Sequence, residues 1–295
     1  MSSVATPAGL LTSEQFLRTP ARPANSVVQL PRETGACVKG WLVVAGLGPG
    51  AQDWVTPEVT AALAAATDVV GYLPYVARVA PRTGLTLHAS DNRVELDRAA
   101  HALCMAGEGR RVVVVSSGDP GVFAMASAVF EAVEAGPAAW RTLDVRVLPG
   151  VTAMLAAAAR AGAPLGHDFC AINLSDNLKP WALVERRLQL AVQADFAMAF
   201  YNPRSASRPQ GFTRALAVLR EACGAAGSPA RPVIFARAVS TPDETIQVVA
   251  LSEVQPEMAD MRTVVIVGSS LTRVIARDGV PWIYTPRSAP TEVSE

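Results

Sequence analysis

Residues 111–122 read RVVVVSSGDPGV, and this stretch decides the fold class. Four consecutive valines are typical of a strand that is buried on both sides of a parallel sheet, because such a strand has no position facing water. The small and turn-forming residues at 116–121 end the strand, and a helix is predicted over 122–134. A strand, a glycine-containing loop and a helix in this order predict an α/β sheet whose loops gather at the carboxyl ends of its strands.

The same order occurs twice more in the first half of the chain. Residues 41–45 (WLVVA) form an apolar run that meets a glycine-rich loop at 46–50. Thr56 follows as the predicted N-cap of the next helix, with Pro57 at its first position, where a missing N–H leaves no hydrogen bond unmade. The elements predicted in this half are strands at 41–45, 68–71, 111–115 and 145–148 and helices at 58–66, 95–107, 122–134 and 152–161.

The second half of the chain has a different order of elements. Strands are predicted at 169–174, 196–201, 233–238, 245–251 and 263–267, and helices at 181–194 and 211–225. Only a short connection separates the last two strands, which predicts antiparallel pairing in a mixed sheet. We therefore predict two α/β domains, the first with a mainly parallel sheet and the second with a mixed sheet, and an active-site cleft between them.

Length and composition agree with this organisation. The chain has 295 residues, half of them apolar, which suffices for two buried cores and excludes wholesale disorder. The predicted parts are a mobile extension rich in Ser, Thr, Pro and Ala at 1–40, a first domain at 41–162, a second domain at 163–286 and a tail at 287–295.

Charge, cysteine content and hydropathy exclude several classes of protein. The 26 Lys and Arg residues balance the 26 Asp and Glu residues, so there is no basic bias for nucleic acid. The four cysteines form no C-x-x-C pair and the chain has only three histidines, so we expect neither a metal site nor a disulfide framework. No apolar run reaches the ~18 residues that span a bilayer, and the N-terminus lacks a secretory pattern. These features predict a cytoplasmic protein with no membrane partner.

Residues 46–51, GLGPGA, match the G-x-G-x-x-A fingerprint of dinucleotide-binding proteins. In that fold the turn runs straight into a helix, and an acidic residue follows the second strand. Here the helix begins several residues later, and the second strand ends at Gly71-Tyr72. An NAD(P)-dependent Rossmann reductase is one alternative, and a simple strand-to-helix turn is another.

Asp119 places a carboxylate at the end of the valine strand. A carboxylate suits a ribose hydroxyl or an ammonium group better than a phosphate, which it repels. The alternative is that Asp119 caps the following helix. Neither glycine loop contains G-K-[ST], so hydrolysis of nucleoside triphosphates is not expected.

Several further stretches are distinctive in their residues and order. They are Val70-Gly71-Tyr72 with Pro74-Tyr75, SSGDPGV at 116–122, GHDFCAI at 166–172, Leu174-Ser175-Asp176 with Pro180-Trp181, and YNPRS at 201–205. By these stretches the chain resembles the tetrapyrrole methylases between residues 41 and 285. The extension at 1–40 departs from the family pattern.

The resemblance implies a homodimer that binds S-adenosylmethionine in the cleft. It places Pro49 at the floor of the site, Gly118, Asp119, Val122 and Phe123 along the ribose and methionine portion, Thr152 and Ala153 near the methionine end, and Asn202, Ala238 and Val239 around the adenosine. Methyl transfer from a sulfonium needs alignment and a dry site more than acid–base help.

The acceptor implied by the resemblance is a reduced tetrapyrrole with many carboxylates, methylated at C17 with contraction of the ring. Contraction moves protons, and the candidate acids or bases are Asp91, His167 and Asp176. His167 has the alternative of a structural role at the domain junction, and Asp176 that of a helix N-cap. Lys179, Arg204 and Arg208 are the cations expected to bind carboxylates, whereas Arg186 and Arg187 are expected on a solvated helix face.

Three other functions stay open at this point. A sister enzyme would methylate another position of the corrin ring, or the cobalt-containing intermediate. A tetrapyrrole carrier would hold its ligand without needing S-adenosylmethionine. The reductase would bind NAD(P) instead.

Overall fold

The computed structural model describes residues 40–92, 94–227 and 230–288. The predicted extension at 1–40 lies outside the described residues except for Gly40, and the predicted tail at 287–295 lies outside them except for its first two residues.

The first sheet contains five strands, all parallel, in the order β3-β2-β4-β1-β5. Its strands are β1 (Trp41–Gly46), β2 (Asp68–Tyr72), β3 (Thr86–Ser90), β4 (Arg111–Ser116) and β5 (Asp144–Leu148). Ala45 of β1 lies beside Val115 of β4 and Leu148 of β5, so the carboxyl ends of these three strands meet at one edge. The sequence pattern did not predict β3, because this edge strand is largely exposed and lacks an apolar run.

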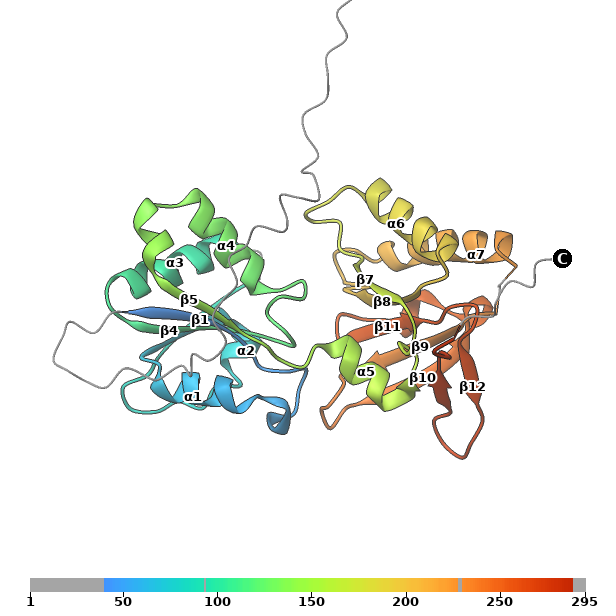
Figure 1. The fold of residues 1–295 in the computed structure, drawn as a ribbon, viewed down its shortest axis with the longest axis horizontal. Helices are drawn as coiled ribbons and strands as arrows, with labels where there is room; N and C mark the ends of the chain where they lie inside the picture. The colour runs from blue at the N-terminus through green and yellow to red at the C-terminus, as the bar shows by residue number, and fades with distance from the viewer. Residues whose placement is uncertain (1–39, 93, 228–229, 289–295) are drawn as a thin grey trace, which may run out of the picture. The chain divides into compact units, whose positions relative to one another are not determined.

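Helices cover both faces of the first sheet (Figure 1). They are α1 (Pro57–Ala65) and α2 (Leu73–Val76) on one face and α3 (Glu95–Gly107) and α4 (Met125–Ala135) on the other. Val113 and Val115 pack with α1 and α2, whereas Val112 and Val114 pack with α3 and α4. Both faces are therefore apolar, which explains the uninterrupted valines.

The helix termini follow local chemistry. Thr56 caps α1 as predicted, because its hydroxyl accepts the N–H of Val59 at 3.3 Å. The helix predicted over 122–134 begins only at Met125. Phe123 has φ 54° and Ala124 is extended, so the chain after β4 cannot enter the helix earlier.

The strand order creates a switch point at the carboxyl edge. The chain leaves β1 through α1 on one face of the sheet and leaves its neighbour β4 through α4 on the other face. The loops after β1 and β4 therefore diverge from adjacent strands. Open α/β sheets bind their ligands at such points.

The second sheet is mixed, as predicted, and has the order β10-β9-β11-β8-β7. Its strands are β7 (Phe169–Asn173), β8 (Ala197–Tyr201), β9 (Pro232–Arg237), β10 (Thr245–Ala250) and β11 (Thr263–Val267). β7 and β8 are parallel, and β11 runs antiparallel to both β8 and β9. β10 and β11 do not pair with each other, because β9 lies between them and pairs antiparallel with both. β7, β8 and β9 thus share one carboxyl edge.

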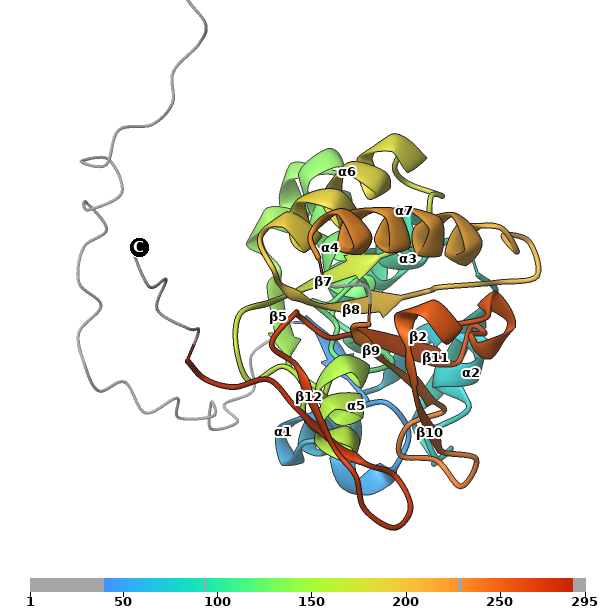
Figure 2. The same cartoon turned by 90° about the vertical axis from the view of Figure 1, so that its right-hand side faces the viewer.

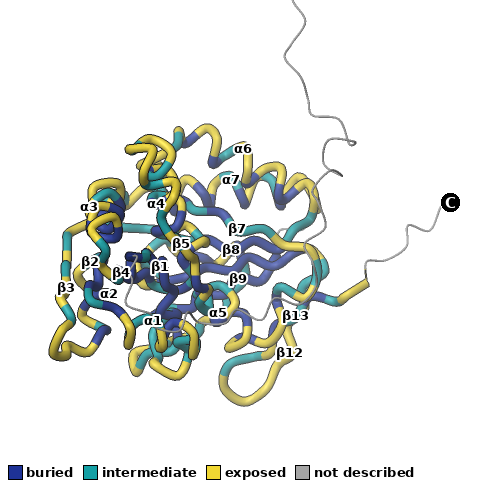
Figure 3. Tube along the Cα trace, turned by 60° about the vertical axis from the view of Figure 1, so that its left-hand side comes forward, coloured by how far each residue is buried: buried dark blue, intermediate teal, exposed yellow. Residues whose placement is uncertain are grey.

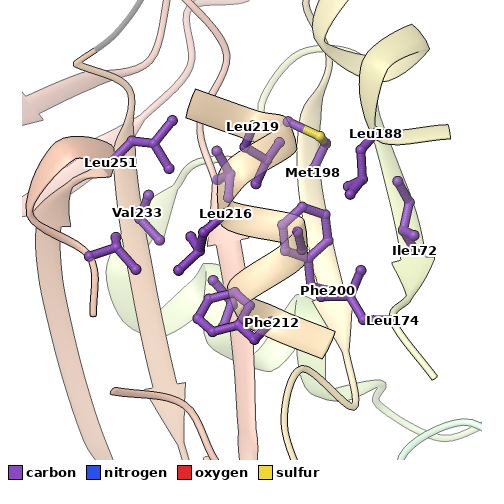
Figure 4. Packing of buried hydrophobic residues seen from close by; sticks show 14 of the residues in the cluster. Ile172, Leu174, Leu188, Met198, Phe200, Phe212, Leu216, Leu219, Val233 and Leu251 are labelled. Atoms are coloured by element: carbon purple, nitrogen blue, oxygen red, sulfur yellow. The ribbon is translucent and has the colours of Figure 1, made fainter. Parts of the chain in front are cut away.

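Helices α6 (Trp181–Gln193) and α7 (Gly211–Ala225) lie on one side of this sheet and α5 (Ala153–Ala161) on the other (Figure 2). Figure 4 shows the larger core, in which Phe212 and Leu216 of α7 meet Phe200 of β8. Each fully buried side chain of this size contributes about 1.5–3 kcal/mol to folding. The buried strands and the exposed outer faces of the helices are visible in Figure 3.

Helix α5 belongs by its packing to the second sheet, although the predicted first domain runs to residue 162. Ala156, Ala157 and Ala161 lie in one cluster with Ile234 and Ile266. All the described residues fall within one compact unit. We propose that the change from first to second half be placed before α5, near Gly150.

A third sheet, in the order β12-β13-β6, was not predicted. It contains β6 (Gly162–Ala163), β12 (Arg273–Ile275) and β13 (Trp282–Tyr284). These strands have two or three residues and are mostly exposed, so they leave no periodic signal.

Asp68 forms a buried polar network at the amino-terminal end of β2. Its carboxylate accepts hydrogen bonds from Thr67 at 2.7 Å and Arg110 at 3.1 Å, and His88 Nε2 lies 2.9 Å away. Burial by itself raises the pKa of Asp68, but these hydrogen bonds and the charge of Arg110 outweigh it, so the pKa is lowered. The network is on the opposite edge from the glycine loops and is structural.

None of the described helices combines the length and the apolarity needed to cross a bilayer.

Candidate functional site

Three glycine-containing loops meet through their backbones at the carboxyl ends of β1, β4 and β5. Gly48 and Gly118 exchange two hydrogen bonds, at 3.2 and 3.0 Å. A Cβ on Gly150 would lie 2.2 Å from the carbonyl oxygen of Gly118, and one on Gly46 would lie 2.6 Å from the same oxygen. Only glycine permits this approach at 46 and 150.

Asp119 joins the second loop to the third. Its Oδ1 accepts the N–H of Gly121 at 2.8 Å, and its Oδ2 accepts the N–H of Gly150 at 3.1 Å. The alternative role as a helix cap is not observed, because α4 begins at Met125 with Ala124 at the N-cap. A carboxylate has about four acceptor positions, so about two remain for a ligand.

The first loop is held by Arg78, which sequence reasoning missed. The guanidinium donates to the carbonyl oxygens of Leu47, Gly48 at 2.9 Å and Gly50 at 3.1 Å. Burial lowers the pKa of Arg78. The sequence held no local signal for this contact, because Arg78 lies about thirty residues further along the chain among turn residues.

The first loop does not have the geometry of a dinucleotide fingerprint. The N–H groups of Leu47, Gly48 and Ala51 already donate to Ser116, Gly118 and Ser240. A 3-10 turn, Gln52–Trp54, also separates the loop from α1. A pyrophosphate needs free N–H groups at a helix N-terminus. The loop therefore argues against the reductase alternative.

Several residues predicted around the cofactor have a strained backbone. Phe123, Asn202 and Ala238 have φ angles of 54°, 51° and 50°, in the left-handed region, which Phe and Ala avoid and Asn tolerates better. Such strain costs about 1–3 kcal/mol per residue and is found mostly at functional sites. Asn202 also donates through Nδ2 to Asn173 at 3.1 Å.

The predicted cofactor residues of the two sheets lie close together. The N–H of Ala51, two residues after Pro49, donates to Ser240 Oγ at 3.0 Å, and Ser240 follows Ala238-Val239 directly. A Cβ on Gly118 would lie 3.6 Å from Thr152 and 3.7 Å from Ala153. The Phe123 ring meets the Tyr201 ring edge-on at 5.3 Å. Val122 closes the turn after Asp119, where its N–H donates to the Asp119 carbonyl at 3.2 Å.

Ser240 is part of a network of polar contacts that sequence reasoning missed. Its N–H donates to Glu244 at 2.6 Å, and Glu244 pairs with Arg160 of α5 at 3.0 Å. The guanidinium of Arg160 lies 5.2 Å from the ring of Trp54. These contacts connect the loop after β9 with α5 and with the turn after the first glycine loop.

The three acid–base candidates flank different ends of the strands β3 and β7. Asp91 directly follows β3 at the carboxyl edge of the first sheet and is exposed. Asp176 follows β7 at the carboxyl edge of the second sheet and is also exposed. His167 precedes β7, about 20 Å along the strand from that edge at ~3.3 Å per residue. Its Nδ1 accepts the N–H of Asp168 at 2.8 Å. The geometry therefore places His167 outside the loop cluster.

The three predicted carboxylate-binding cations lie in the loops after β7 and β8. Lys179 donates to the carbonyl oxygen of Ser175 at 2.8 Å. Burial, followed by the positive charges of Arg187 and Arg208, lowers the pKa of Lys179, while Asp176 opposes this shift. Arg187 lies on the exposed face of α6, as the sequence predicted, and its positive charge still acts on Lys179.

Two of the arginines have an unpaired buried nitrogen. Among the described residues, the buried Nε atoms of Arg204 and Arg208 have no hydrogen-bond partner. Arg204 approaches Glu257 only at 3.9 Å. Arginines in this state retain donors for an anionic ligand. No three His, Cys, Asp or Glu side chains within the described ranges are grouped to hold a metal ion.

Comparison with known proteins agrees with the sequence motifs. Residues 41–255 match the model of the Tetrapyrrole (Corrin/Porphyrin) Methylases. A precorrin-3B C(17)-methyltransferase from Sinorhizobium sp is 53% identical over 249 residues, which cover 84% of this chain and 96% of that protein. The cobalamin biosynthesis protein CobIJ of Mycobacterium tuberculosis is 46% identical over 273 residues, 91% of this chain and 52% of that protein. This chain therefore spans about half the length of CobIJ.

A solved structure has the same fold. The crystal structure of the methyltransferase CobJ superimposes with a TM-score of 0.79 and 69% sequence identity, covering 84% of this chain and 100% of that one. The matched family model spans well over half of the chain and includes all three glycine loops. From its motifs, its two sheets and these comparisons, the chain belongs to the tetrapyrrole methylases.

Proposed function

We propose that this protein is an S-adenosylmethionine-dependent methyltransferase that methylates C17 of precorrin-3B and contracts its ring to precorrin-4 in cobalamin biosynthesis. The observation that carries the proposal is the backbone contact of three glycine loops at a sheet switch point, with Asp119 joining two of them. The names of the similar proteins support the choice of substrate and position.

The loop cluster fits an adenosyl cofactor by its chemistry. Asp119 retains acceptor positions that suit ribose hydroxyls, and the glycines leave backbone atoms open to close contact. When bound, S-adenosylmethionine supplies a methyl group on a sulfonium, which passes to a nucleophilic carbon while the bonding pair stays on a neutral thioether. The chain's own contribution is then to orient the two reactants and to exclude water.

The substrate is proposed to lie against the carboxyl edge of the second sheet. Lys179, Arg204 and Arg208 would bind its carboxylates there, with Arg187 adding to the local positive charge. Of the acid–base candidates for ring contraction, Asp91 and Asp176 are at carboxyl edges, whereas His167 is not. We therefore propose that one of these two aspartates moves the proton.

Two further proposals concern where the enzyme works and how it assembles. The scattered cysteines support a cytoplasmic enzyme, and the family resemblance supports a homodimer. Sedimentation equilibrium tests the second proposal, because a monomer at micromolar concentration contradicts it.

Calorimetric titration with S-adenosylhomocysteine, with NADH as a parallel control, tests the cofactor. Micromolar binding of the homocysteine compound alone supports the proposal. Binding of NADH alone overturns it in favour of a reductase, and binding of neither ligand also contradicts it. Asp119→Ala should weaken S-adenosylhomocysteine about tenfold or more, the scale of a hydrogen bond to a charged group. Asp144→Ala, at the amino-terminal end of β5, is the control.

Incubation with methyl-labelled S-adenosylmethionine and precorrin-3B tests the position of methylation. Label at C17 of a contracted ring is the expected product. Label at another carbon would identify a sister enzyme, and turnover of only the cobalt-containing intermediate would move the protein to that substrate. Tetrapyrrole binding without any methyl transfer would favour a carrier.

A further inference from the structure

Tyr201 is the last residue of β8, and its side chain contacts segments far from it in the sequence. Its hydroxyl forms a hydrogen bond with the hydroxyl of Thr152 and accepts the N–H of Met154 at 3.0 Å. Its ring packs edge-on against Phe123 at 5.3 Å. One side chain of the second sheet thus touches the start of α5 and the loop that follows β4.

The Tyr201 hydroxyl caps the N-terminus of α5. The first N–H groups of a helix have no partner inside the helix and are usually satisfied by the N-cap side chain. Thr152 occupies the N-cap of α5 but makes no such bond. The N–H of Met154 is satisfied by Tyr201 instead. Thr152 is only 5% exposed, and its hydroxyl is oriented by the hydrogen bond with the Tyr201 hydroxyl.

Counting protons shows that the pair retains a donor. The oxygen of Tyr201 accepts from Met154, and a single hydrogen bond joins the two hydroxyls, so one of their two protons is left over. Within the described part of the chain, neither hydroxyl has a further partner. Burial raises the pKa of Tyr201, so its hydroxyl stays protonated at neutral pH.

The surroundings of this donor combine one negative charge, that of Asp119, with groups that attract a carboxylate. Helix α5 directs its positive N-terminal end toward the same place, and Gly118 lies beside Thr152. Phe123 is 47% exposed and held in a left-handed conformation against Tyr201, so part of its ring faces outward. A ligand seated on the glycine loops would therefore meet an O–H donor, a helix N-terminus and an aromatic ring together.

We infer that Tyr201 is a positioning residue of the cofactor site, and that the Tyr201–Thr152 pair donates one hydrogen bond to the carboxylate of the bound cofactor. This inference rests on the proposed function, because S-adenosylmethionine is the ligand proposed there. It adds Tyr201, a residue of the second sheet, to a methionine end near which the resemblance placed Thr152 and Ala153.

Calorimetry with two ligands tests the inference. S-adenosylhomocysteine carries the carboxylate, and 5′-methylthioadenosine lacks it while keeping the adenosine and the thioether. Tyr201→Phe should weaken S-adenosylhomocysteine about tenfold, as expected for a lost hydrogen bond to a charged group, and leave 5′-methylthioadenosine within about twofold. Tyr284→Phe is the matched control, because Tyr284 lies on β13 and, among the described residues, its hydroxyl forms a hydrogen bond only with Arg273, at 3.5 Å.

Variants of Thr152 make the test independent of the folding of Tyr201→Phe. In either single variant the remaining hydroxyl keeps its proton but loses the partner that orients it. Thr152→Val should therefore weaken S-adenosylhomocysteine like Tyr201→Phe, Thr152→Ser should retain binding, and the double variant should be no weaker than the weaker single variant. Unchanged S-adenosylhomocysteine affinity in Tyr201→Phe or in Thr152→Val would refute the inference. So would an equal loss for both ligands, which indicates general damage to the site. A wild-type protein that binds neither ligand refutes the proposed function instead, before any variant is made.

Discussion

Replacing Gly150 by alanine tests whether the contact of the glycine loops is a structural requirement. The added Cβ would lie 2.2 Å from the carbonyl oxygen of Gly118 and 2.8 Å from that of Gly46. The first distance is 0.8 Å shorter than the 3.0 Å that real Cβ atoms respect. Both neighbours are backbone atoms of buried loops, so the loops themselves must separate.

The cost follows from the hydrogen bonds that this separation breaks. They are the two bonds between Gly48 and Gly118 and the charge-assisted bond from Gly150 to Asp119. Neutral bonds contribute about 0.5–1.5 kcal/mol each and the charged one about 1.5–3 kcal/mol. The reduced freedom of the unfolded chain returns about 0.4–1 kcal/mol. We expect Gly150→Ala to lose about 2–5 kcal/mol of stability.

Urea unfolding at 25 °C, followed by tryptophan fluorescence, measures the loss, and calorimetry with S-adenosylhomocysteine measures the site. Gly224→Ala is the control, because Gly224 lies in α7 with no atom within 4 Å of its added Cβ. That change should stabilise the protein by up to about 1 kcal/mol. If Gly150→Ala unfolds at the wild-type urea concentration and binds the ligand normally, the reasoning from the glycine contact is wrong.

Three further predictions follow from single side chains. Asp68→Asn should lower the free energy of unfolding at pH 7 and reduce its fall in acid, because the folded pKa of Asp68 is lowered. Such a carboxylate stabilises the protein above about pH 4 and loses this effect as the pH falls through its folded pKa. Urea unfolding at pH 7 and pH 3.5 contradicts this if the wild type and the variant lose the same stability between the two pH values. Arg78→Gln should weaken S-adenosylhomocysteine about tenfold, because three carbonyl groups of the first loop lose a charged donor, and an unchanged dissociation constant would remove Arg78 from the site. Arg187→Gln should weaken the binding of the octacarboxylate uroporphyrin several-fold and reduce the salt dependence of that binding, both measured by fluorescence quenching. Arg186→Gln is the control and should change neither. Equal effects of the two substitutions would contradict a specific contribution of Arg187 to the binding of carboxylates.

Local sequence features determined most of the elements of the two large sheets. The valines at 112–115 encode a strand buried on both faces, and Thr56-Pro57 encodes a helix start, because these signals act between residues that are neighbours in the chain. The same motifs identified the family, since the glycine loops and their flanking residues lie in short uninterrupted stretches. Elements without such signals were missed: β3 is an exposed edge strand, and the third sheet has strands of two or three residues.

The composition of the site depended on the tertiary structure. Arg78 reaches the first loop across 30 residues, Tyr201 reaches Thr152 across 49, and Ala51 reaches Ser240 across 189. Such partners are decided by strand order and by which face each helix covers, neither of which has a local signature in the chain. For His167 the motif is specific in the sequence, but the residue lies at the amino-terminal end of β7, away from the loops at the carboxyl edge. The sequence by itself determined which loops exist and what chemistry they carry, whereas folding decided which of their side chains meet.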